Sequence, residues 1–298
     1  MKLLVLGRDG QVGTALQKLL PAVGDIVALG RDGADFEVPG RLAEIVARER
    51  PDVILNAAAY TAVDKAESEP ERAARVNAGA PGELAEAAAR LGAWMIHYST
   101  DYVFDGSGSR PWVETDATAP LSVYGRTKRD GEIAIAASGA KHLIFRTSWV
   151  HAPGGNNFIA KILKRAAEQD ELKVIDDQIG APTSALLIAE VTAKAIEAIG
   201  AGRAPESGIY HLAAAGATSW NGYARFAIAD AMARGQKLKA TPERVLPVPT
   251  TAFPTPAQRP LNSRLSTEKL RRALKIELPD WEDDVRLTLD ALIAEPTP

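Results

Sequence analysis

The chain has 298 residues, of which 46% are hydrophobic and 24% charged, and its formal net charge is −3. A chain of this length can bury one large core or two smaller ones. The weak negative charge gives no electrostatic reason to expect a nucleic acid or an anionic membrane as a partner. Cysteine is absent, which excludes disulfides and thiolate chemistry and favours the cytoplasm as the location.

Two features argue against a membrane protein. The first residues, MKLLVLGRDG, hold an apolar run that is too short for a signal peptide. The sequence also lacks a stretch of about 18 apolar residues, the length needed to cross a bilayer. We therefore expect a soluble intracellular protein without a membrane partner.

The first 150 residues predict strands that alternate with helices. The strands are expected as mostly apolar runs, as in a sheet buried on both faces; they cover 2–7, 25–30, 52–59, 94–100 and 141–150. The helices are expected at 11–24, 41–50, 71–92 (irregular near Pro81) and 122–138. This alternation predicts a parallel sheet with right-handed crossovers, which is the doubly wound α/β class.

After about residue 150 the pattern changes. Glycine- and proline-rich segments at 151–158 and 246–260 resemble loops, and helices are expected at 158–169 and 184–200. We expect a first domain at 1–150 and a smaller second lobe formed mainly by 151–298, with some segments returning to the first domain. Ordered proline-rich loops beside a sheet often form the wall of a binding cleft.

Three evenly spaced glycines follow the first expected strand. Gly7, Gly10 and Gly13 lie in GRDGQVG, between that strand and the first helix. Small residues let the backbone approach a pyrophosphate, and the free N–H groups at the helix start favour an anion. The spacing departs by one residue from the G-x-G-x-x-G fingerprint, but the position is the one that this motif requires. A turn that only needs small residues remains the alternative.

The second expected strand ends at LGRDGADF, which places Arg31 and Asp32 beside Gly30. In dinucleotide-binding folds an acidic residue here binds the ribose 2′-OH of NADH, and an arginine accommodates the 2′-phosphate of NADPH. Arg31 has the forked donor group that suits a phosphate, so we expect NADPH. Asp32 leaves NADH possible, or it caps a turn.

The segments HYSTDYVFDG and VYGRTK form a second group of polar residues. Thr100 ends an expected strand at the sheet edge where open α/β sheets bind ligands. Tyr124 and Lys128 are one helical turn apart, so they share a helix face. A nearby ammonium would lower the tyrosine pKa from about 10, so that the phenol can exchange a proton with a carbonyl oxygen. By spacing alone, a chance surface pair explains Tyr124 and Lys128 equally well.

Together, GRDGQVG, STDYVFDG and VYGRTK resemble the extended short-chain dehydrogenase/reductase family. The longer segments NAAAYTAVDKAESEP, FRTSWVHAPGGNNF, DDQIGAPTSA and PTPAQRPLNSRLSTEKL narrow the resemblance to members that reduce dTDP-linked 4-keto-6-deoxy sugars. It covers nearly the whole chain, from Lys2 to about Trp281. It implies a Rossmann-like fold, with an NAD(P)-binding domain at 1–150 and a substrate-binding lobe mainly at 151–298. The implied reaction is reduction of a C4 keto group by NADPH, with NADH possible.

The resemblance also implies roles for individual residues. Tyr124 would donate the proton, Lys128 would orient the nicotinamide ribose and tune Tyr124, and Thr100 would support both. The implied cofactor-binding residues are Gly7, Gly10, Gln11, Val12, Gly13, Arg31, Asp35, Phe36, Ala59, Tyr60, Thr61, Tyr124 and Lys128. The implied substrate-binding residues are Thr100, Asp101, Trp149, Asn157 and Arg259.

Two departures from the family limit what can be transferred. Ala15 stands where some members carry a glutamate that bridges a dimer through magnesium, so we expect no bound metal and a monomer or weak homodimer without a metal bridge. Gly30 replaces an acidic residue found in some relatives, which again favours NADPH. His97, within an apolar strand, is expected to be a core histidine with satisfied hydrogen bonds rather than a ligand.

Two other functions remain open at this point. One is a nucleotide-sugar epimerase or dehydratase on the same scaffold, although a dehydratase is expected to carry an Asp-Glu-type pair in place of Thr100-Asp101. The other is a regulatory subunit that has kept the fold and a bound nucleotide, which fold alone does not exclude. Intact Thr100, Tyr124 and Lys128 favour the reductase.

Overall fold

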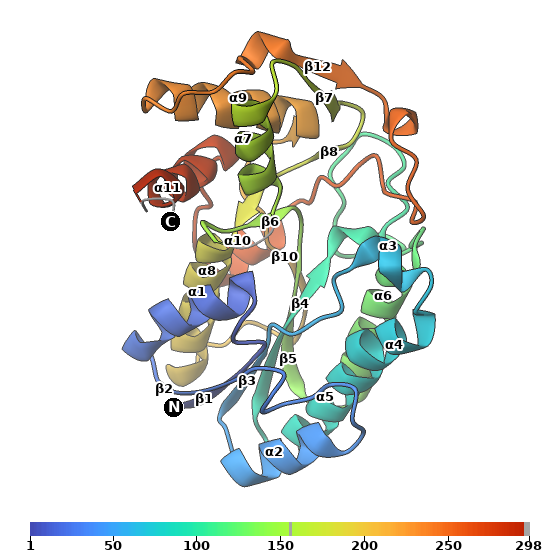
Figure 1. The fold of residues 1–298 in the computed structure, drawn as a ribbon. Helices are drawn as coiled ribbons and strands as arrows, with labels where there is room; N and C mark the ends of the chain where they lie inside the picture. The colour runs from blue at the N-terminus through green and yellow to red at the C-terminus, as the bar shows by residue number, and fades with distance from the viewer. Residues whose placement is uncertain (155–156, 295–298) are drawn as a thin grey trace.

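A six-stranded parallel sheet forms the centre of the computed structural model, which describes residues 1–154 and 157–294 (Figure 1). Its strands are β1 (Lys2–Leu6), β2 (Asp25–Leu29), β3 (Val53–Asn56), β4 (Trp94–Thr100), β5 (Lys141–Thr147) and β10 (Gly208–His211). They lie in the order β2-β1-β3-β4-β5-β10, and every neighbouring pair is parallel. This arrangement confirms the predicted doubly wound, Rossmann-like fold, and its strand order reverses between β1 and β3.

Helices cover both faces of the sheet because the buried strands are apolar on both sides. In β1, Leu3 and Val5 pack into one core cluster, whereas Leu4 and Leu6 pack into the other. The first face carries α1 (Gln11–Leu19) and α8 (Ala185–Gly200), which pack on each other; the second carries α2 (Arg41–Glu49), α5 (Ala80–Leu91) and α6 (Val123–Ala137) (Figure 1).

Two expected elements are interrupted. The long helical region consists of α4 (Pro70–Ala74), a π-helical turn at Arg75–Gly79 and then α5, so the predicted irregularity lies just before Pro81. The prediction of one continuous strand at 141–150 is wrong. It ends at Thr147 and resumes as β6 (Val150–His151), because Trp149 between them has a left-handed backbone with φ of 48°. A large side chain seldom adopts this conformation without a specific reason.

Most of the second half of the chain forms a group of elements above the sheet in Figure 1, which we call the C-terminal lobe. It contains the helices α7 (Phe158–Glu168), α9 (Trp220–Ala233) and α11 (Trp281–Ala294), and the strands β6, β7 (Leu172–Ile175), β8 (Ile179–Gly180), β9 (Thr183–Ser184), β11 (Thr218–Ser219) and β12 (Val245–Val248). Although they come late in the chain, α8, β10 and α10 (Glu268–Leu274) pack with the central sheet. The domain boundary near residue 150 stays a prediction.

The remaining elements are short. They are α3 (Val63–Ala66) and the 3₁₀ turns η1 (Leu20–Ala22), η3 (Asp101–Val103), η4 (Pro242–Arg244) and η5 (Thr250–Ala252). Among the helices of residues 1–154 and 157–294, none combines the length and the apolar character needed to span a bilayer.

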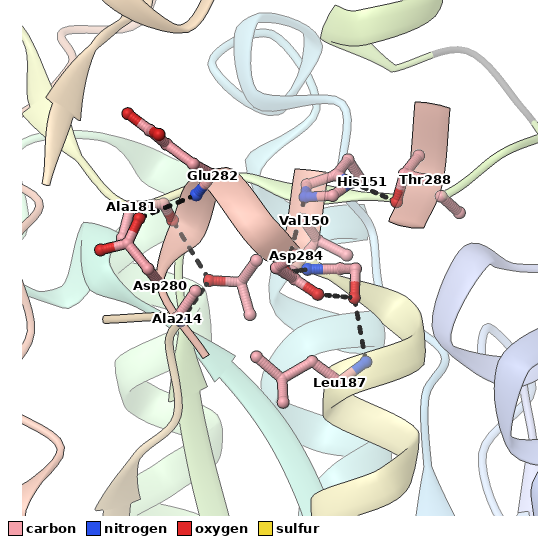
Figure 2. A network of polar contacts seen from close by, with 12 residues as sticks. Val150, His151, Ala181, Leu187, Ala214, Asp280, Glu282, Asp284 and Thr288 are labelled. Carbon is pink, nitrogen blue, oxygen red and sulfur yellow. Dashed lines mark hydrogen bonds and ion pairs between the residues drawn. The ribbon is translucent and has the colours of Figure 1, made fainter. Parts of the chain in front are cut away.

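A buried polar network joins α11 to the start of α8 and to β6 (Figure 2). Asp284 accepts hydrogen bonds from the backbone N–H (2.6 Å) and the hydroxyl (2.5 Å) of Ser184, and this hydroxyl oxygen accepts from the Leu187 N–H that opens α8. His151 Nδ1 lies 3.0 Å from the Thr288 hydroxyl. A serine, a histidine and an aspartate meet here, but the serine bonds to the carboxylate and not to the imidazole. The cluster therefore anchors α11 and is no catalytic triad.

Candidate active site at the carboxyl end of the sheet

The start of α1 lies at the point where the strand order reverses and follows a tight glycine turn. A Cβ on Gly13 would lie 2.0 Å from the carbonyl oxygen of Gly7, so only glycine allows the turn to close against the helix. Gly10 begins α1 and has no side chain that could cap it, and the first turn contains no acidic residue. The first turn of α1 therefore leaves the N–H groups of Gln11, Val12 and Gly13 without partners inside the helix. These groups form the positive end of the helix dipole, which fits a pyrophosphate.

Charged residues from two loops meet beside the end of β2. The N–H groups of Gly7 and Arg8 bond to the Leu29 carbonyl, at 3.0 and 3.2 Å, so the two loops are held together. Arg8 Nη2 then lies 2.9 Å from Asp32, and the exposed Arg31 pairs with Glu37. The cofactor contact of Arg31 stays a prediction. The structure adds Arg8 to this place, which the sequence did not indicate because only the fold brings residue 8 next to residue 32.

The other residues predicted for the dinucleotide are divided between surface and core. Ala59 and Tyr60 are half-buried and Thr61 is exposed after β3; the Tyr60 hydroxyl donates to Glu69 at 2.8 Å. Asp35 is half-buried and accepts from the Glu37 N–H at 2.9 Å. Phe36, however, is buried in the core beside Leu4 and Leu6. Its predicted contact with adenine is therefore not supported, because its ring packs inward.

Thr100 and Tyr124 lie together at the end of β4. Burial raises the pKa of Tyr124 to about 12, while the Thr100 hydroxyl opposes this rise and the neighbouring Asp101 adds to it. The Tyr124 ring meets the ring of Tyr102 edge-on, with centroids 5.7 Å apart. The Ser122 hydroxyl accepts from the Gly125 N–H at 3.1 Å, so a side-chain cap fixes the first turn of α6 and with it the position of Tyr124.

Lys128 lies one turn further along α6 and is 1% exposed. Its Nζ donates to the Tyr98 carbonyl at 2.6 Å and lies 3.1 Å from His97 Nε2. The sequence predicts that Lys128 lowers the pKa of Tyr124, whereas the pKa is raised. The reason is that burial dominates and that the amino group bonds to β4. Burial also lowers the pKa of Lys128 to about 8, although Glu132 opposes this.

His97 is fully buried, and both of its ring nitrogens have partners, Asn56 at 3.0 Å and Lys128 at 3.1 Å. The prediction of a core histidine with satisfied hydrogen bonds is confirmed. Its direct contact with Lys128 was not foreseen, because the two residues are 31 positions apart in the chain.

Asp101 is a buried carboxyl group that is only partly satisfied. The Thr100 hydroxyl donates to Oδ1 at 3.2 Å, and among the described residues Oδ2 has no partner. Burial raises the pKa of Asp101 to about 7, against the opposing hydrogen bonds from Ser263 and Thr100. Such a carboxyl group can either donate or accept a hydrogen bond near neutral pH.

A pocket of about 280 Å³ lies between the sheet edge and the C-terminal lobe. Four aromatic and three cationic side chains line it: Tyr102, Phe158, Trp220, Phe253, Arg165, Lys173 and Arg259. Trp149 lies behind Trp220, and the two rings stack with centroids 3.7 Å apart. A Cβ on Gly180 would lie 2.8 Å from the Trp149 ring, so glycine lets the left-handed Trp149 pack there.

Of the predicted substrate-binding residues Arg259 and Asn157, only Arg259 lines the pocket. Arg259 lines it and holds Asp64 through two hydrogen bonds of 3.1 and 2.9 Å. Asn157 instead caps α7: its oxygen accepts from the Ala160 N–H, and its nitrogen donates to Gln11 and to the Ala152 carbonyl. Because these internal bonds occupy the Asn157 side chain, its predicted substrate contact is not supported.

Several residues of the pocket were missed by the sequence reasoning. Trp220 and Tyr223 both lie on α9, where Tyr223 is fully buried and Trp220 reaches the pocket. Phe158 ends the segment FRTSWVHAPGGNNF and Phe253 lies in the proline-rich segment 246–260, but neither was predicted as a site residue. In the part of the chain that the structure describes, no group of three or more histidine, aspartate or glutamate side chains could hold a metal ion.

Comparisons with known proteins identify the family of this chain. The model of the RmlD substrate binding domain family matches residues 1–294. A dTDP-4-dehydrorhamnose reductase from Shigella flexneri is 51% identical over 98% of each chain. The crystal structure of a dTDP-4-dehydrorhamnose reductase from Clostridium acetobutylicum has a TM-score of 0.89 at 33% identity, covering 98% of this chain and 100% of that one.

A second solved structure carries a cofactor. The dTDP-4-dehydrorhamnose reductase from Bacillus anthracis, in complex with NADP, has a TM-score of 0.88 at 31% identity and covers 99% of each chain. The sequence resemblance is thereby confirmed over the full length of the described fold. The chain belongs to the family of dTDP-4-dehydrorhamnose reductases.

Proposed function

We propose that this chain reduces the C4 keto group of dTDP-4-dehydro-β-L-rhamnose to give dTDP-L-rhamnose, the last step of dTDP-rhamnose synthesis. One observation carries the proposal. The Tyr124 ring packs edge-to-face with Tyr102, which lines the pocket, so a group that can give a proton lies next to a site lined by aromatic and cationic side chains. The names of the relatives support the same substrate.

The start of α1 fits a dinucleotide. The N–H groups of Gln11, Val12 and Gly13 would hold its pyrophosphate, and Arg8 and Arg31 would face a ribose 2′-phosphate, which favours NADPH while NADH remains possible. The Bacillus anthracis reductase with bound NADP supports this choice. When bound, the nicotinamide supplies the hydride.

In this proposal Tyr124 gives its phenolic proton to the C4 oxygen of the substrate. The raised pKa keeps the phenol protonated at neutral pH. Thr100 donates a hydrogen bond to the same oxygen as negative charge develops on it. Lys128 keeps an N–H group beyond the one that it donates to the Tyr98 carbonyl, and this N–H would orient the nicotinamide ribose.

The pocket would receive the nucleotide part of the substrate. Phe158, Trp220 and Phe253 offer faces on which a thymine ring can stack, and Arg165, Lys173 and Arg259 offer charges for a diphosphate. Asp101 and Trp149 would also contact the substrate, from the side of the sheet edge. Residues 1–150 would thus hold mainly the dinucleotide and 151–298 mainly the sugar nucleotide. A cytoplasmic monomer or weak homodimer without a metal bridge completes the proposal.

The direct test is to mix the purified protein with dTDP-4-dehydro-β-L-rhamnose and either NADPH or NADH, and to follow the loss of reduced cofactor by absorbance. We expect oxidation with NADPH at the higher kcat/KM, together with dTDP-L-rhamnose identified by chromatography. A parallel sample with UDP-glucose and NAD⁺ tests for epimerase activity. If neither reduced cofactor is oxidised, the reductase proposal is wrong.

A further inference from the structure

Behind Tyr124, three buried side chains form a chain of hydrogen bonds that ends at Lys128. Asn56 and His97 are direct neighbours in the register of β3 and β4, and Asn56 Nδ2 lies 3.0 Å from His97 Nδ1. His97 Nε2 lies 3.1 Å from Lys128 Nζ. The exposed fractions of Asn56, His97 and Lys128 are 1%, 0% and 1%, so water does not compete for these bonds.

One backbone group fixes the direction of this chain. The Ala58 N–H donates to Asn56 Oδ1 at 3.2 Å, so the amide turns its NH₂ group toward the imidazole. His97 Nδ1 must then accept a hydrogen bond. A neutral imidazole carries its single hydrogen on the other nitrogen, so Nε2–H points at Lys128 Nζ. An ammonium group has no lone pair to accept this hydrogen, whereas a neutral amine has one.

The charged alternative does not fit the same contacts. If Lys128 were an ammonium, it would donate to Nε2, and the imidazole hydrogen would move to Nδ1. Nδ1–H would then face the NH₂ group of Asn56, two donors 3.0 Å apart. Rotating the amide would relieve this conflict but would turn the NH₂ group toward the Ala58 N–H. A buried donor without an acceptor costs about 1–3 kcal/mol.

The charges around Lys128 do not stabilise an ammonium strongly. The carboxylate of Glu132, one turn along α6, is already bonded to Arg146 of β5 and to Ser99 of β4. Asp101 and Tyr124 hold pKa values raised to about 7 and about 12. The π-helical turn contributes the uncharged Asn77, which donates to Thr127. Burial lowers the pKa of Lys128 to about 8 and also lowers that of His97.

From this geometry we propose that His97, oriented by Asn56, is a positioning residue that donates a hydrogen bond to Lys128 and favours the neutral amine over the ammonium. The consequence for catalysis rests on the proposed function. Only the ammonium form stabilises the phenolate that Tyr124 leaves behind. Asn56 and His97 therefore set the pH above which the reductase loses activity.

The first experiment reads the tautomer of His97 in the protein without added ligands, by ¹⁵N NMR of the imidazole nitrogens. The chain has four histidines, and the signals lost in His97→Gln assign His97. At about pH 9, where an ordinary lysine with a pKa of about 10.4 is still charged, we expect hydrogen on Nε2 and none on Nδ1. Hydrogen on Nδ1 at this pH would overturn the proposal.

The second experiment reverses the direction of the chain. In Asn56→Asp a carboxylate can accept from both Ala58 N–H and His97 Nδ1–H, so Nε2 becomes an acceptor and Lys128 an ammonium. We expect His97 to carry its hydrogen on Nδ1 in this variant. The alkaline limb of the pH profile of kcat should move up by about one pH unit or more, which corresponds to a tenfold change in the protonation equilibrium of Lys128. An unmoved limb in a folded variant contradicts the proposal.

Asn56→Leu is the matched control because it removes the constraint without adding charge. We expect its alkaline limb between those of the parent protein and Asn56→Asp. If Asn56→Leu leaves the limb where it was, the shift in Asn56→Asp is a charge effect, and the proposed direction of the hydrogen bonds is wrong. The tautomer measurement needs no substrate, so a failure of NADPH oxidation would overturn the proposed function and leave this test intact.

Discussion

Two groups of buried polar side chains lie at the same end of β4 and β5, and they differ in how their charges are satisfied. In the paired cluster, Glu132 accepts from Ser99 at 2.5 Å and from Arg146 at 2.9 and 2.7 Å. The guanidinium of Arg146 also lies 5.0 Å from the centroid of the Phe104 ring. Both charges of the pair are 3% exposed.

The reactive cluster consists of Thr100, Asp101, Tyr124 and Lys128, and it lacks such pairing. Burial moves the pKa of Asp101 up to about 7 and that of Lys128 down to about 8. Ser99 and Thr100 are adjacent in β4, yet strand alternation directs one to each cluster. One strand can thus stabilise the fold with one side chain and serve the chemistry with the next.

The largest expected effect comes from breaking the reactive cluster. Tyr124→Phe removes the proton donor but keeps the ring against Tyr102, so we expect kcat to fall by about 10²–10⁴-fold while NADPH binding stays unchanged. Steady-state kinetics and a fluorescence titration with NADPH measure the two quantities. Turnover close to that of the parent protein would remove Tyr124 from its proposed role.

Removing one charge of the paired cluster should lower the stability of the fold instead. Glu132→Gln leaves the buried guanidinium of Arg146 without a counter-charge, so we expect the free energy of unfolding to fall by about 3–5 kcal/mol. Urea denaturation measures this change. The control is Asp130→Asn, which breaks the neighbouring surface pair with Arg129 and should cost less than about 1 kcal/mol. Equal losses in both variants would show that burial of the pair has no role.

A smaller effect should follow from neutralising the reactive cluster. The pKa of Asp101 is raised from an ordinary value of 3.8 to about 7. The folded protein therefore binds more protons than the unfolded chain between these values, and stability falls as the pH rises through this window. Asp101→Asn should remove this loss, making the variant more stable than the parent by about 1–3 kcal/mol at pH 8.

Unfolding free energies of both proteins at about pH 4 and at pH 8 test this expectation. Other buried carboxyl groups, such as Asp284 with its pKa raised to about 6, contribute equally to both proteins and cancel in the difference. The same pH dependence in the two proteins would show that Asp101 does not titrate in this range.

The sequence predicted the sheet well because buried parallel strands are continuous apolar runs. The expected strand at 94–100 matches β4, and that at 2–7 exceeds β1 by one residue. The break at Trp149 was not predicted, since its left-handed backbone depends on stacking against Trp220, 71 positions away. The position of Phe36 in the core and that of Asn157 at the start of α7 were not predicted, because residue type alone does not show whether a side chain faces the core, caps a helix or reaches a site.

The doubly wound fold and the glycine turn at Gly7–Gly13 follow from the sequence, because strand periodicity and motif spacing are local properties of the chain. The candidate set of Thr100, Tyr124 and Lys128 rests on the family resemblance, since the spacing of Tyr124 and Lys128 also fits a chance surface pair. Tertiary structure alone decided that Arg8 meets Asp32, that Glu132 pairs with Arg146, and that His97 lies against Lys128. These contacts join residues far apart in the chain. Burial then sets their pKa values, and burial exists only once the layers have packed.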